Sequence, residues 1–433
     1  QQLAQLQPIV ILAEDIHWLD EASAELLATL IRAGTTTSLL IVATHRPPTS
    51  QTAALLTKID ELPNQTLIRL SELVDAELIT LAVARLRAPL DDLALDFLQA
   101  QAQGNPFFIE ELLDSLRESG DLVLDEENEA PAQWRLAAPF VAQLQAADCL
   151  KPVGDGWRLK SQTSLSAAAI GLPDSIHGIV LARLDRLPDA VQLTVKTASV
   201  IGRDFELDVL QHAHPQRIDQ AQLAAHLATL EARDFARIES VEPAPVYRFK
   251  HNITQEVAYQ TLLDRQRRQL HQTVGETLEA LQPESVDRLA LHFYYSDTDD
   301  TQLRTKSLHY LDAAAHQAKL EYANQIALNY LTRALKLERS WPRVRDKVEL
   351  LHILGLREEE AQALLVLDLE AVAGAEVRPA PEIRQIETKL LWSGYYDAVS
   401  DYARARAVVG EALESSRVRG IWRTAARCYA QLG

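Results

Sequence analysis

The chain has 433 residues, of which 47 % are hydrophobic and 24 % charged, a globular composition that excludes extensive disorder and allows two to four domains at roughly 100–200 residues each. Its 61 acidic and 43 basic residues give a net charge of −18, which disfavours nucleic-acid binding because a negative surface repels phosphates. Only two, widely separated cysteines occur and no apolar run is long enough to span a membrane, so we expect a cytoplasmic protein without a disulfide framework.

The N-terminal residues predict a strand, a helix and a second strand. The apolar run PIVILAED at 8–15 is typical of a strand buried on both faces of a parallel sheet. The helix that follows is expected to be capped by Asp20 and ended by Gly34. A second buried strand is predicted at about 38–44, and the run TLIRL at 66–70 could be a third. This order indicates a βαβ unit, so the sheet should be parallel.

Polar residues follow both predicted strands. Glu14 and Asp15 end the first strand, and an acid pair at such a position can hold Mg²⁺ and orient an attacking water in a nucleotide hydrolase. Thr44 and Arg46 end the second strand, and in a parallel sheet the two ends lie near each other, on the side where ligands bind. The alternatives are a strand end with a helix cap for the acids and an exposed turn before Pro47 for the arginine.

Helical spacing dominates from Ser71 to about Gly120, interrupted by GNPFF at 104–108. Gly104 permits an unusual turn there, and Pro106 suits the first position of a new helix because its missing N–H leaves no donor unsatisfied. Residues 121–170 are the least regular stretch and contain two similar pieces, QWRL and GWRL. We interpret this stretch as a linker with some hairpin content.

Residues 171–280 predict a compact, helix-rich unit with one small hairpin. A helix capped by Asp174 opens it, and VYRFKH at 246–251 alternates like a strand. Helices followed by a short β-ribbon favour a winged helix. His251 ends the ribbon, and a lone histidine at such a place is more often structural than functional.

Helical hairpins are predicted from about residue 284 onward. Ala327, Leu331 and Ala334 have the small-large-small spacing of the second helix of a tetratricopeptide repeat. The pattern recurs at Ala398, Tyr402 and Ala405, about two repeats of roughly 34 residues later. The last residues, AARCYAQLG, are typical of the first helix of a further repeat.

Taken in order, these motifs carry a resemblance. The strings EDIHWLD, THRP, GNPFFIEELL, LPDSIHGIVLARLDRLP and YRFKHNITQEVAYQTLL, followed by a tetratricopeptide-like tail, resemble the STAND-class P-loop ATPases of the AAA type that accompany bacterial class III adenylate or guanylate cyclases, serine/threonine kinases and large LuxR-type regulators. The resemblance covers nearly the whole chain and is poorest over 121–170.

The resemblance implies roles for the candidate residues. Glu14 and Asp15 would be the Walker B acids and the metal-side residues, although many members of the class have two aspartates. Arg46 would be a catalytic sensor arginine and Thr44 a cofactor contact beside it. Pro106 would contact the nucleotide from a helical lid, and His251 would touch the ADP β-phosphate. The acid that follows this histidine in the class is Asn252 here. The cofactors implied are ATP or ADP and Mg²⁺.

The phosphate-binding string G-x-x-x-x-G-K-[ST] occurs nowhere in the sequence. In the STAND class this loop precedes Walker B, so it would lie before Gln1, and we expect the chain to be an internal piece of a longer protein. The loop supplies most of the grip on the phosphates. The chain by itself should therefore bind ATP poorly and hydrolyse it at no useful rate.

The expected fold is mainly α-helical with an N-terminal α/β part. It comprises the C-terminal half of a P-loop domain (1–70), a helical lid (71–120), a linker (121–170), a winged helix (171–280) and an α-solenoid of tetratricopeptide-like repeats (281–433). The expected function is an ATP-binding switch that controls an attached effector, binds protein partners through its repeats and self-associates on activation. The alternatives are a winged-helix DNA-binding regulator, with RQRRQLH at 265–271 as its basic contact, and a non-catalytic helical scaffold.

Overall fold

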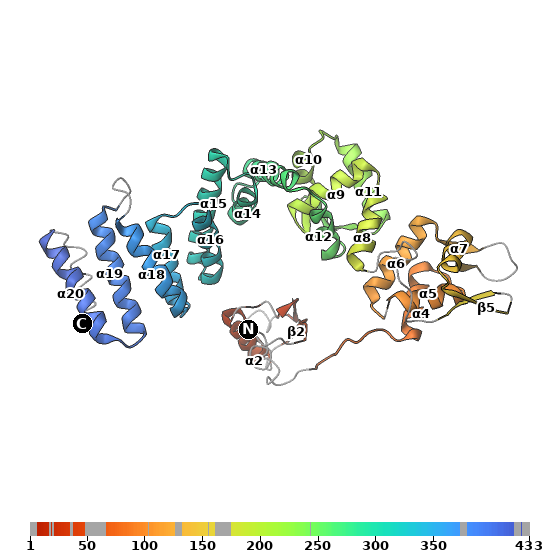
Figure 1. The fold of residues 1–433 in the computed structure, drawn as a ribbon, viewed down its shortest axis with the longest axis horizontal. Helices are drawn as coiled ribbons and strands as arrows, with labels where there is room; N and C mark the ends of the chain where they lie inside the picture. Colours follow the sequence, from red (N-terminus) through yellow and green to blue (C-terminus); the bar gives the residue numbers. More distant parts are fainter. Residues whose placement is uncertain are drawn as a thin grey trace. The chain divides into compact units, whose positions relative to one another are not determined.

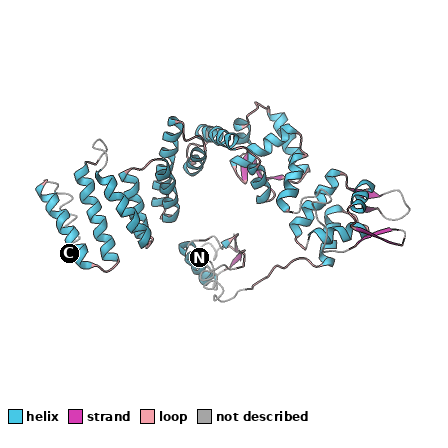
Figure 2. Cartoon of the chain, in the orientation of Figure 1, coloured by secondary structure: helices cyan, strands magenta, loops and turns pink. Residues whose placement is uncertain are grey.

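The computed structural model shows a mainly α-helical chain with four small sheets among the described residues (Figures 1 and 2). This confirms the predicted fold class at a coarse level. The described residues are 7–16, 19, 21–34, 38–47, 66–102, 104–125, 132–154, 156–160, 175–242, 244–372, 379–419 and 426. The chain divides into two compact units, Gln1–Leu73 and Val74–Gly433, and each is described by itself.

The first unit contains the predicted strand–helix–strand segment. Its elements are β1 (Ile9–Ala13), α2 (Glu21–Gly34) and β2 (Leu39–Ala43). The two strands pair in parallel, with Ile9 opposite Leu39 and Ala13 opposite Ala43, so the predicted parallel pairing is confirmed. The helix ends at Gly34 as expected, whereas its predicted cap, Asp20, lies outside the described residues.

Two predictions for this unit are wrong. The strands are not buried on both faces: Ile16, Leu27 and Ile41 pack together on the α2 side, while Val10 is 65 % and Leu12 62 % exposed on the other. The reason is that α2 alone covers the sheet among the described elements. Residues 66–70 are not a strand either, because no strand of the described chain pairs with them, and their side chains are exposed.

The second unit begins with three helices and two hairpins. The elements are α4 (Asp75–Leu86), α5 (Asp92–Ala102), α6 (Pro106–Ser119), β3 (Leu122–Asp125), β4 (Gln133–Leu136), α7 (Ala138–Ala146), β5 (Leu150–Val153) and β6 (Gly156–Leu159). The prediction that GNPFF starts a helix is confirmed: the Asn105 side chain accepts a hydrogen bond from the Phe108 amide at 3.1 Å, and Pro106 occupies the first turn.

The predicted hairpin content of the linker is confirmed. QWRL and GWRL are the second strands, β4 and β6, of two antiparallel hairpins. Each hairpin is fixed to the helices beside it. The Trp134 indole donates to the Leu86 carbonyl at 3.2 Å, and the Arg158 guanidinium donates to Asp96 at 2.5 and 2.7 Å. Helix α7 between the hairpins was not predicted.

Residues 175–281 fold around one large core. The elements are α8 (Ile176–Asp185), α9 (Asp189–Ile201), β7 (Asp204–Glu206), α10 (Leu207–Ala213), α11 (Gln220–Ala232), β8 (Ala236–Ser240), β9 (Val246–Phe249), α12 (Asn252–Gln260) and α13 (Asp264–Leu281). The three strands form an antiparallel sheet in the order β7-β9-β8, and the predicted strand at 246 is confirmed. The Ser175 hydroxyl caps α8, whereas Asp174 lies outside the described residues.

Helices pack consecutively from α13 to α20 in the last part of the chain (Figure 1). They are α14 (Val286–Tyr295), α15 (Thr301–Leu320), α16 (Asn324–Leu337), α17 (Trp341–Ile353), α18 (Arg357–Val372), α19 (Pro381–Ala398) and α20 (Tyr402–Val418). The predicted helical hairpins are thus confirmed. The expected further helix at AARCYAQLG lies, except for residue 426, outside the described residues.

Three of these hairpins share one turn. The connections α15–α16, α17–α18 and α19–α20 each contain a left-handed residue, with φ of 59° at Tyr322, 72° at Gly355 and 63° at Ser400. The next residue donates its amide to the carbonyl five positions earlier in every case: Ala323 to Ala318, Leu356 to Leu351 and Asp401 to Tyr396. This is the Schellman arrangement, and it sets the three hairpins in register with one another.

The shared register confirms one predicted repeat pattern and corrects the other. Ala327, Leu331 and Ala334 are buried on α16 as expected. Their counterparts on α20, counted from the left-handed residues, are Ala405, Val409 and Ala412, which are also buried. The predicted set Ala398–Tyr402–Ala405 is wrong because Ala398 ends α19 and Tyr402 begins α20, with the turn between them, and both are exposed.

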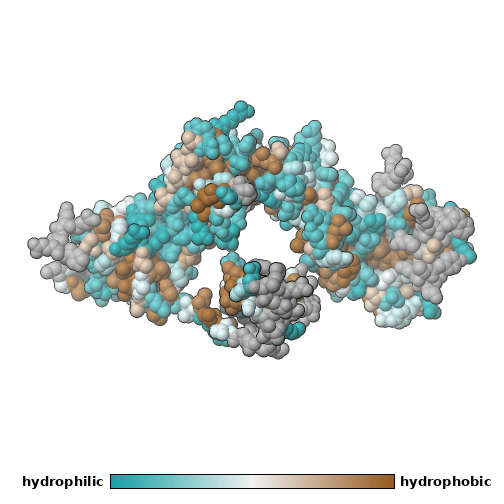
Figure 3. All heavy atoms as spheres, turned by 180° about the vertical axis from the view of Figure 1, so that it is seen from behind, coloured by the Kyte–Doolittle hydropathy of each residue, from teal (hydrophilic) through white to brown (hydrophobic). Residues whose placement is uncertain are grey.

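The surface is mixed in character. On the face drawn in Figure 3, hydrophobic residues gather in separate patches among hydrophilic ones, including patches over the C-terminal repeats. Across the described part of the chain, no helix combines the length and the apolarity needed to cross a membrane.

Candidate functional site

The predicted acid pair and Thr44 lie together at the carboxyl ends of β1 and β2. The Thr44 amide donates to the Ala13 carbonyl at 2.9 Å, and the Ile16 amide donates to the Thr44 carbonyl at 2.9 Å. The Thr44 hydroxyl accepts a hydrogen bond from the Asp15 amide at 3.1 Å. Three hydrogen bonds therefore fix the turn that carries the acids against the end of the neighbouring strand.

Asp15 has a left-handed backbone, with φ of 54°, a conformation that aspartate tolerates better than most residues. Glu14, Asp15, Thr44 and Arg46 are all exposed. Two carboxylates on a fixed turn offer the hard oxygen ligands that Mg²⁺ prefers, so the residues present fit that ion. No group of three or more His, Cys, Asp or Glu side chains that could hold a metal occurs among the described residues.

Replacing Thr44 by valine should loosen this turn. The change keeps the shape of the side chain but removes the acceptor for the Asp15 amide, a loss of about 1 kcal/mol for a typical neutral hydrogen bond. Hydrogen exchange of the Asp15 amide should accelerate several-fold in Thr44→Val. The Thr44→Ser variant keeps the hydroxyl and should exchange like the wild type. Equal exchange in both variants would show that the hydroxyl does not hold the turn.

Pro106 and His251 belong to the second unit. Phe107, the residue after Pro106, contacts His251. The Phe107 ring contacts the His251 ring with a centroid separation of 4.2 Å, and Phe107 also packs against the core of the 175–281 part. The His251 Nε2 atom is buried, and none of the described groups forms a hydrogen bond with it. Burial lowers the pKa of His251, and the positive charge of Lys250 lowers it further, so the ring is neutral at pH 7.

Ion pairs around His251 join α6 to the 175–281 part, and sequence reasoning missed all of them. Lys250 pairs with Glu110 of α6 at 3.1 Å and with Asp234. Arg85 of α4 reaches Asp234 at 2.6 Å and also pairs with Asp114 of α6. The one feature of the sequence that pointed to ion pairs near His251 is the basic residue directly before it, Lys250.

Arg183 of α8 is, like Asp114, a fully buried member of this network. Its guanidinium is 1 % exposed and donates to Glu111 at 2.6 Å and to Glu118 at 2.8 Å. It also donates to the Arg233 carbonyl at 2.7 Å and lies 4.7 Å from the centre of the Phe235 ring. Burial raises the pKa of Glu111, which the nearby Arg183 counteracts. Charged groups therefore make a large share of the contact between α6 and α8.

The structure thus gathers the predicted site residues into two groups. Glu14, Asp15, Thr44 and Arg46 share the strand ends of the first unit. In the second unit, Pro106 begins α6, and His251, which precedes α12, contacts the neighbouring Phe107.

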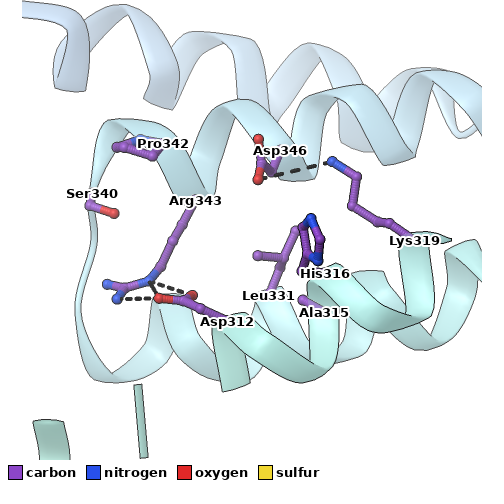
Figure 4. A pocket seen from close by; sticks show the side chains of 9 residues that line it. All are labelled: Asp312, Ala315, His316, Lys319, Leu331, Ser340, Pro342, Arg343 and Asp346. Atoms are coloured by element: carbon purple, nitrogen blue, oxygen red, sulfur yellow. Dashed lines mark hydrogen bonds and ion pairs between the residues drawn. The ribbon is translucent and has the colours of Figure 1, made fainter. Parts of the chain in front are cut away.

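A separate pocket of about 320 Å³ lies within the repeats, between α15 and the start of α17 (Figure 4). Arg343 makes a two-pronged ion pair with Asp312, at 2.9 and 2.8 Å. Lys319 lies across the pocket, 4.0 Å from Asp346. Arg343 and Lys319, which line the pocket, each pair with an aspartate, so the pocket offers no excess charge for a ligand of one sign.

The chain is similar to an uncharacterized bacterial protein and to a solved archaeal structure. A stretch of 269 residues, 61 % of this chain, is 27 % identical to an uncharacterized protein of Rhizobium meliloti (strain 1021) and covers 22 % of that protein. The chain thus spans about a fifth of the length of this relative. No protein-family model matches the chain.

The solved structure of a Signal Transduction ATPase with Numerous Domains (STAND) protein with a tetratricopeptide repeat sensor, from Pyrococcus horikoshii, aligns with 98 % of this chain and 70 % of its own. The TM-score is 0.35 and the identity 10 %, values at which the two chains cannot be said to share a fold.

Proposed function

We propose that the chain is the regulatory part of a cytoplasmic, nucleotide-controlled signalling ATPase of the STAND class. The observation that carries this proposal is the acid pair Glu14–Asp15 on a fixed turn at the carboxyl end of a parallel strand pair, with Thr44 beside it. Ligands of open α/β sheets bind at this edge. Glu14 and Asp15 would hold Mg²⁺, and Arg46 would face the γ-phosphate of ATP.

The second unit would supply the lid and the switch. Helices α4–α6 would form the lid, with Pro106 towards the nucleotide base. The element order of residues 189–249, with the sheet order β7-β9-β8, fits a winged helix that ends at His251. The buried His251 Nε2 atom, which lacks a hydrogen-bond partner among the described residues, would donate to a phosphate oxygen of ADP. The ion pairs between α6 and α8 would hold this closed arrangement, and the repeats would receive the activating partner.

The rival function, DNA recognition by the winged helix, is disfavoured by α11. This is the helix that would enter the major groove, yet residues 220–232 contain neither lysine nor arginine. Contacts to phosphates and to guanine need such side chains. The basic run at 265–271 lies on α13, where Arg268 faces Asp297 at 3.6 Å. Strong, salt-dependent retention on DNA would contradict this argument.

The proposal is tested on the protein encoded by the complete open reading frame. We expect that reading frame to contain G-x-x-x-x-G-K-[ST] before Gln1, and its product to bind MgADP and hydrolyse MgATP. The variants Glu14→Gln and Asp15→Asn should each reduce hydrolysis by about 100-fold or more, because they remove charge that the reaction needs, while ADP binding changes little. The exposed acid variant Glu72→Gln serves as the control.

Two outcomes would contradict the proposal. A complete reading frame without the phosphate loop would make the acids relics and favour the helical scaffold. Hydrolysis that survives both substitutions would place the chemistry elsewhere in the protein.

A further inference from the structure

Helix α18 differs from its structural equivalents at its solvent-exposed positions. Counted from the shared left-handed residues, the position that is Thr332 on α16 and Gly410 on α20 is Leu365 on α18. The position that is Lys336 on α16 and Glu414 on α20 is Leu369. Two polar or small surface positions of the neighbouring repeats are thus leucines in the middle one.

Both leucines face solvent. Leu365 is 60 % and Leu369 74 % exposed, while the opposite side of the helix buries Leu364 and Leu367 in the core of the repeats. The two leucines are four residues apart, so they lie one above the other on the helix surface. Exposed leucines occur singly on most proteins, but an aligned pair that the equivalent helices lack indicates a contact surface.

Acidic residues accompany this apolar stripe. Glu358 lies on the same face two turns before Leu365, and Glu359 and Asp368 are exposed beside it. The helix contains five acidic residues and a single basic one, Arg357. Of these acids, Glu360 is buried, where it pairs with His352 at 2.8 Å and with Arg357 at 2.6 Å. The exposed face of α18 therefore combines two leucines with acidic side chains that form no ion pair with the described residues. Asp368 accepts a hydrogen bond from the Trp392 indole at 2.9 Å and keeps its negative charge.

We propose that the exposed face of α18 is the docking site for a basic amphipathic helix of a partner protein. The leucines of that helix would cover Leu365 and Leu369, and its flanking lysines or arginines would meet Glu358, Glu359 and Asp368. Apolar contact would supply most of the affinity. The acidic residues would favour a positively charged partner and speed its association. The inference holds whether or not the chain responds to nucleotide.

The test uses the whole chain and a labelled synthetic peptide of about five helical turns, with leucines at i, i+3, i+4 and i+7 and lysines on the remaining faces. Fluorescence anisotropy at 0.15 M salt should show saturable binding. The double variant Leu365→Thr/Leu369→Lys gives α18 the surface residues of α16 and should weaken binding at least tenfold. The control Leu320→Thr removes another exposed leucine, at the α15–α16 turn, and should bind like the wild type. A peptide with glutamate in place of lysine should not bind.

Three results would overturn the proposal. Equal binding by the double variant would place the contact elsewhere. Equal binding of the glutamate peptide would show that the acidic residues select nothing. A dimer of the wild-type chain in light scattering that dissociates in the double variant would show that the stripe binds a second copy of the chain.

Discussion

Replacing Arg183 by methionine is expected to destabilise the second unit by about 3–5 kcal/mol, the usual effect of removing one partner from a buried ion pair. Methionine fills similar space but donates no hydrogen bond, so Glu111 and Glu118 lose their shared partner. Glu111 is 3 % exposed and would have to take up a proton or draw water into the contact. The Arg233 carbonyl would also lose its donor.

Urea denaturation followed by circular dichroism measures the overall loss. Hydrogen exchange shows which helices are destabilised, and α6 and α8 should lose protection before the repeats. The control Arg237→Met removes an exposed arginine whose ion pair with Glu239 spans 3.8 Å, and a loss below about 1 kcal/mol is expected for such a pair. The double variant Arg183→Met/Glu111→Leu should regain part of the stability, because it no longer buries an unpartnered carboxylate. A double variant less stable than Arg183→Met would contradict this account.

Acidification from pH 7 to pH 5 should destabilise the second unit through a buried histidine pair. His271 and His292 lie 3.0 Å apart between their Nδ1 atoms, and the His271 Nε2 atom lies 2.9 Å from the Tyr259 hydroxyl. Burial lowers the pKa of His271 to about 4 and that of His292 to about 3. Nearby positive charge adds to both shifts, from Arg267 for His271 and from Arg288 for His292.

The direction follows from proton binding. Between the unfolded pKa of about 6.5 and these lowered values, the unfolded chain binds protons that the folded chain does not. The stability from the neutral pair is therefore complete above about pH 6.5 and falls as the pH decreases. Each histidine contributes about 1.4 kcal/mol per pH unit, so the pair should lose roughly 4 kcal/mol by pH 5.

Urea denaturation at pH 7, 6 and 5 measures this slope. His214 and His251 also have pKa values lowered by burial, so the comparison needs a variant that removes the pair alone. His271→Gln/His292→Gln should be less stable than the wild type at pH 7 but should show a shallower fall towards pH 5. The exposed His212→Gln variant should retain the wild-type slope. A steep slope in the double variant would assign the pH dependence to other groups.

The sequence predicted helices and strands well where the residues of a single segment determine the structure. The apolar runs at 8–15 and about 38–44 and the helix between them indicated the parallel pair that β1 and β2 form. GNPFF indicated a helix start because capping depends on a few adjacent residues. The same runs could not reveal that one face of the sheet is open, since that depends on which other elements cover it.

Ion pairs between residues far apart in the sequence, and the conformation of the turns between helices, could not be predicted from the sequence. In α6 the acids of EELLDSLRE are typical of a solvent-facing helix, yet Glu111 and Asp114 are buried because Arg183 and Arg85 reach them from elsewhere in the chain. The repeat register failed at Ala398 because the turn that follows uses Ser400 in a left-handed conformation, where a glycine would have marked the helix end. Of the candidate site, the residues at the carboxyl ends of β1 and β2 were predicted together, and the ion pairs around His251 were not predicted.

The matching turns at Tyr322, Gly355 and Ser400 also indicate where residues could be deleted or duplicated. Because the three connections have one backbone geometry, deleting residues 323–355 would join α15 to α18 through an unchanged turn, and duplicating the same segment would add one hairpin. The array could therefore be shortened or lengthened by whole hairpins without designing a new loop. The exposed face of α18 could in this way be moved to another position along the array.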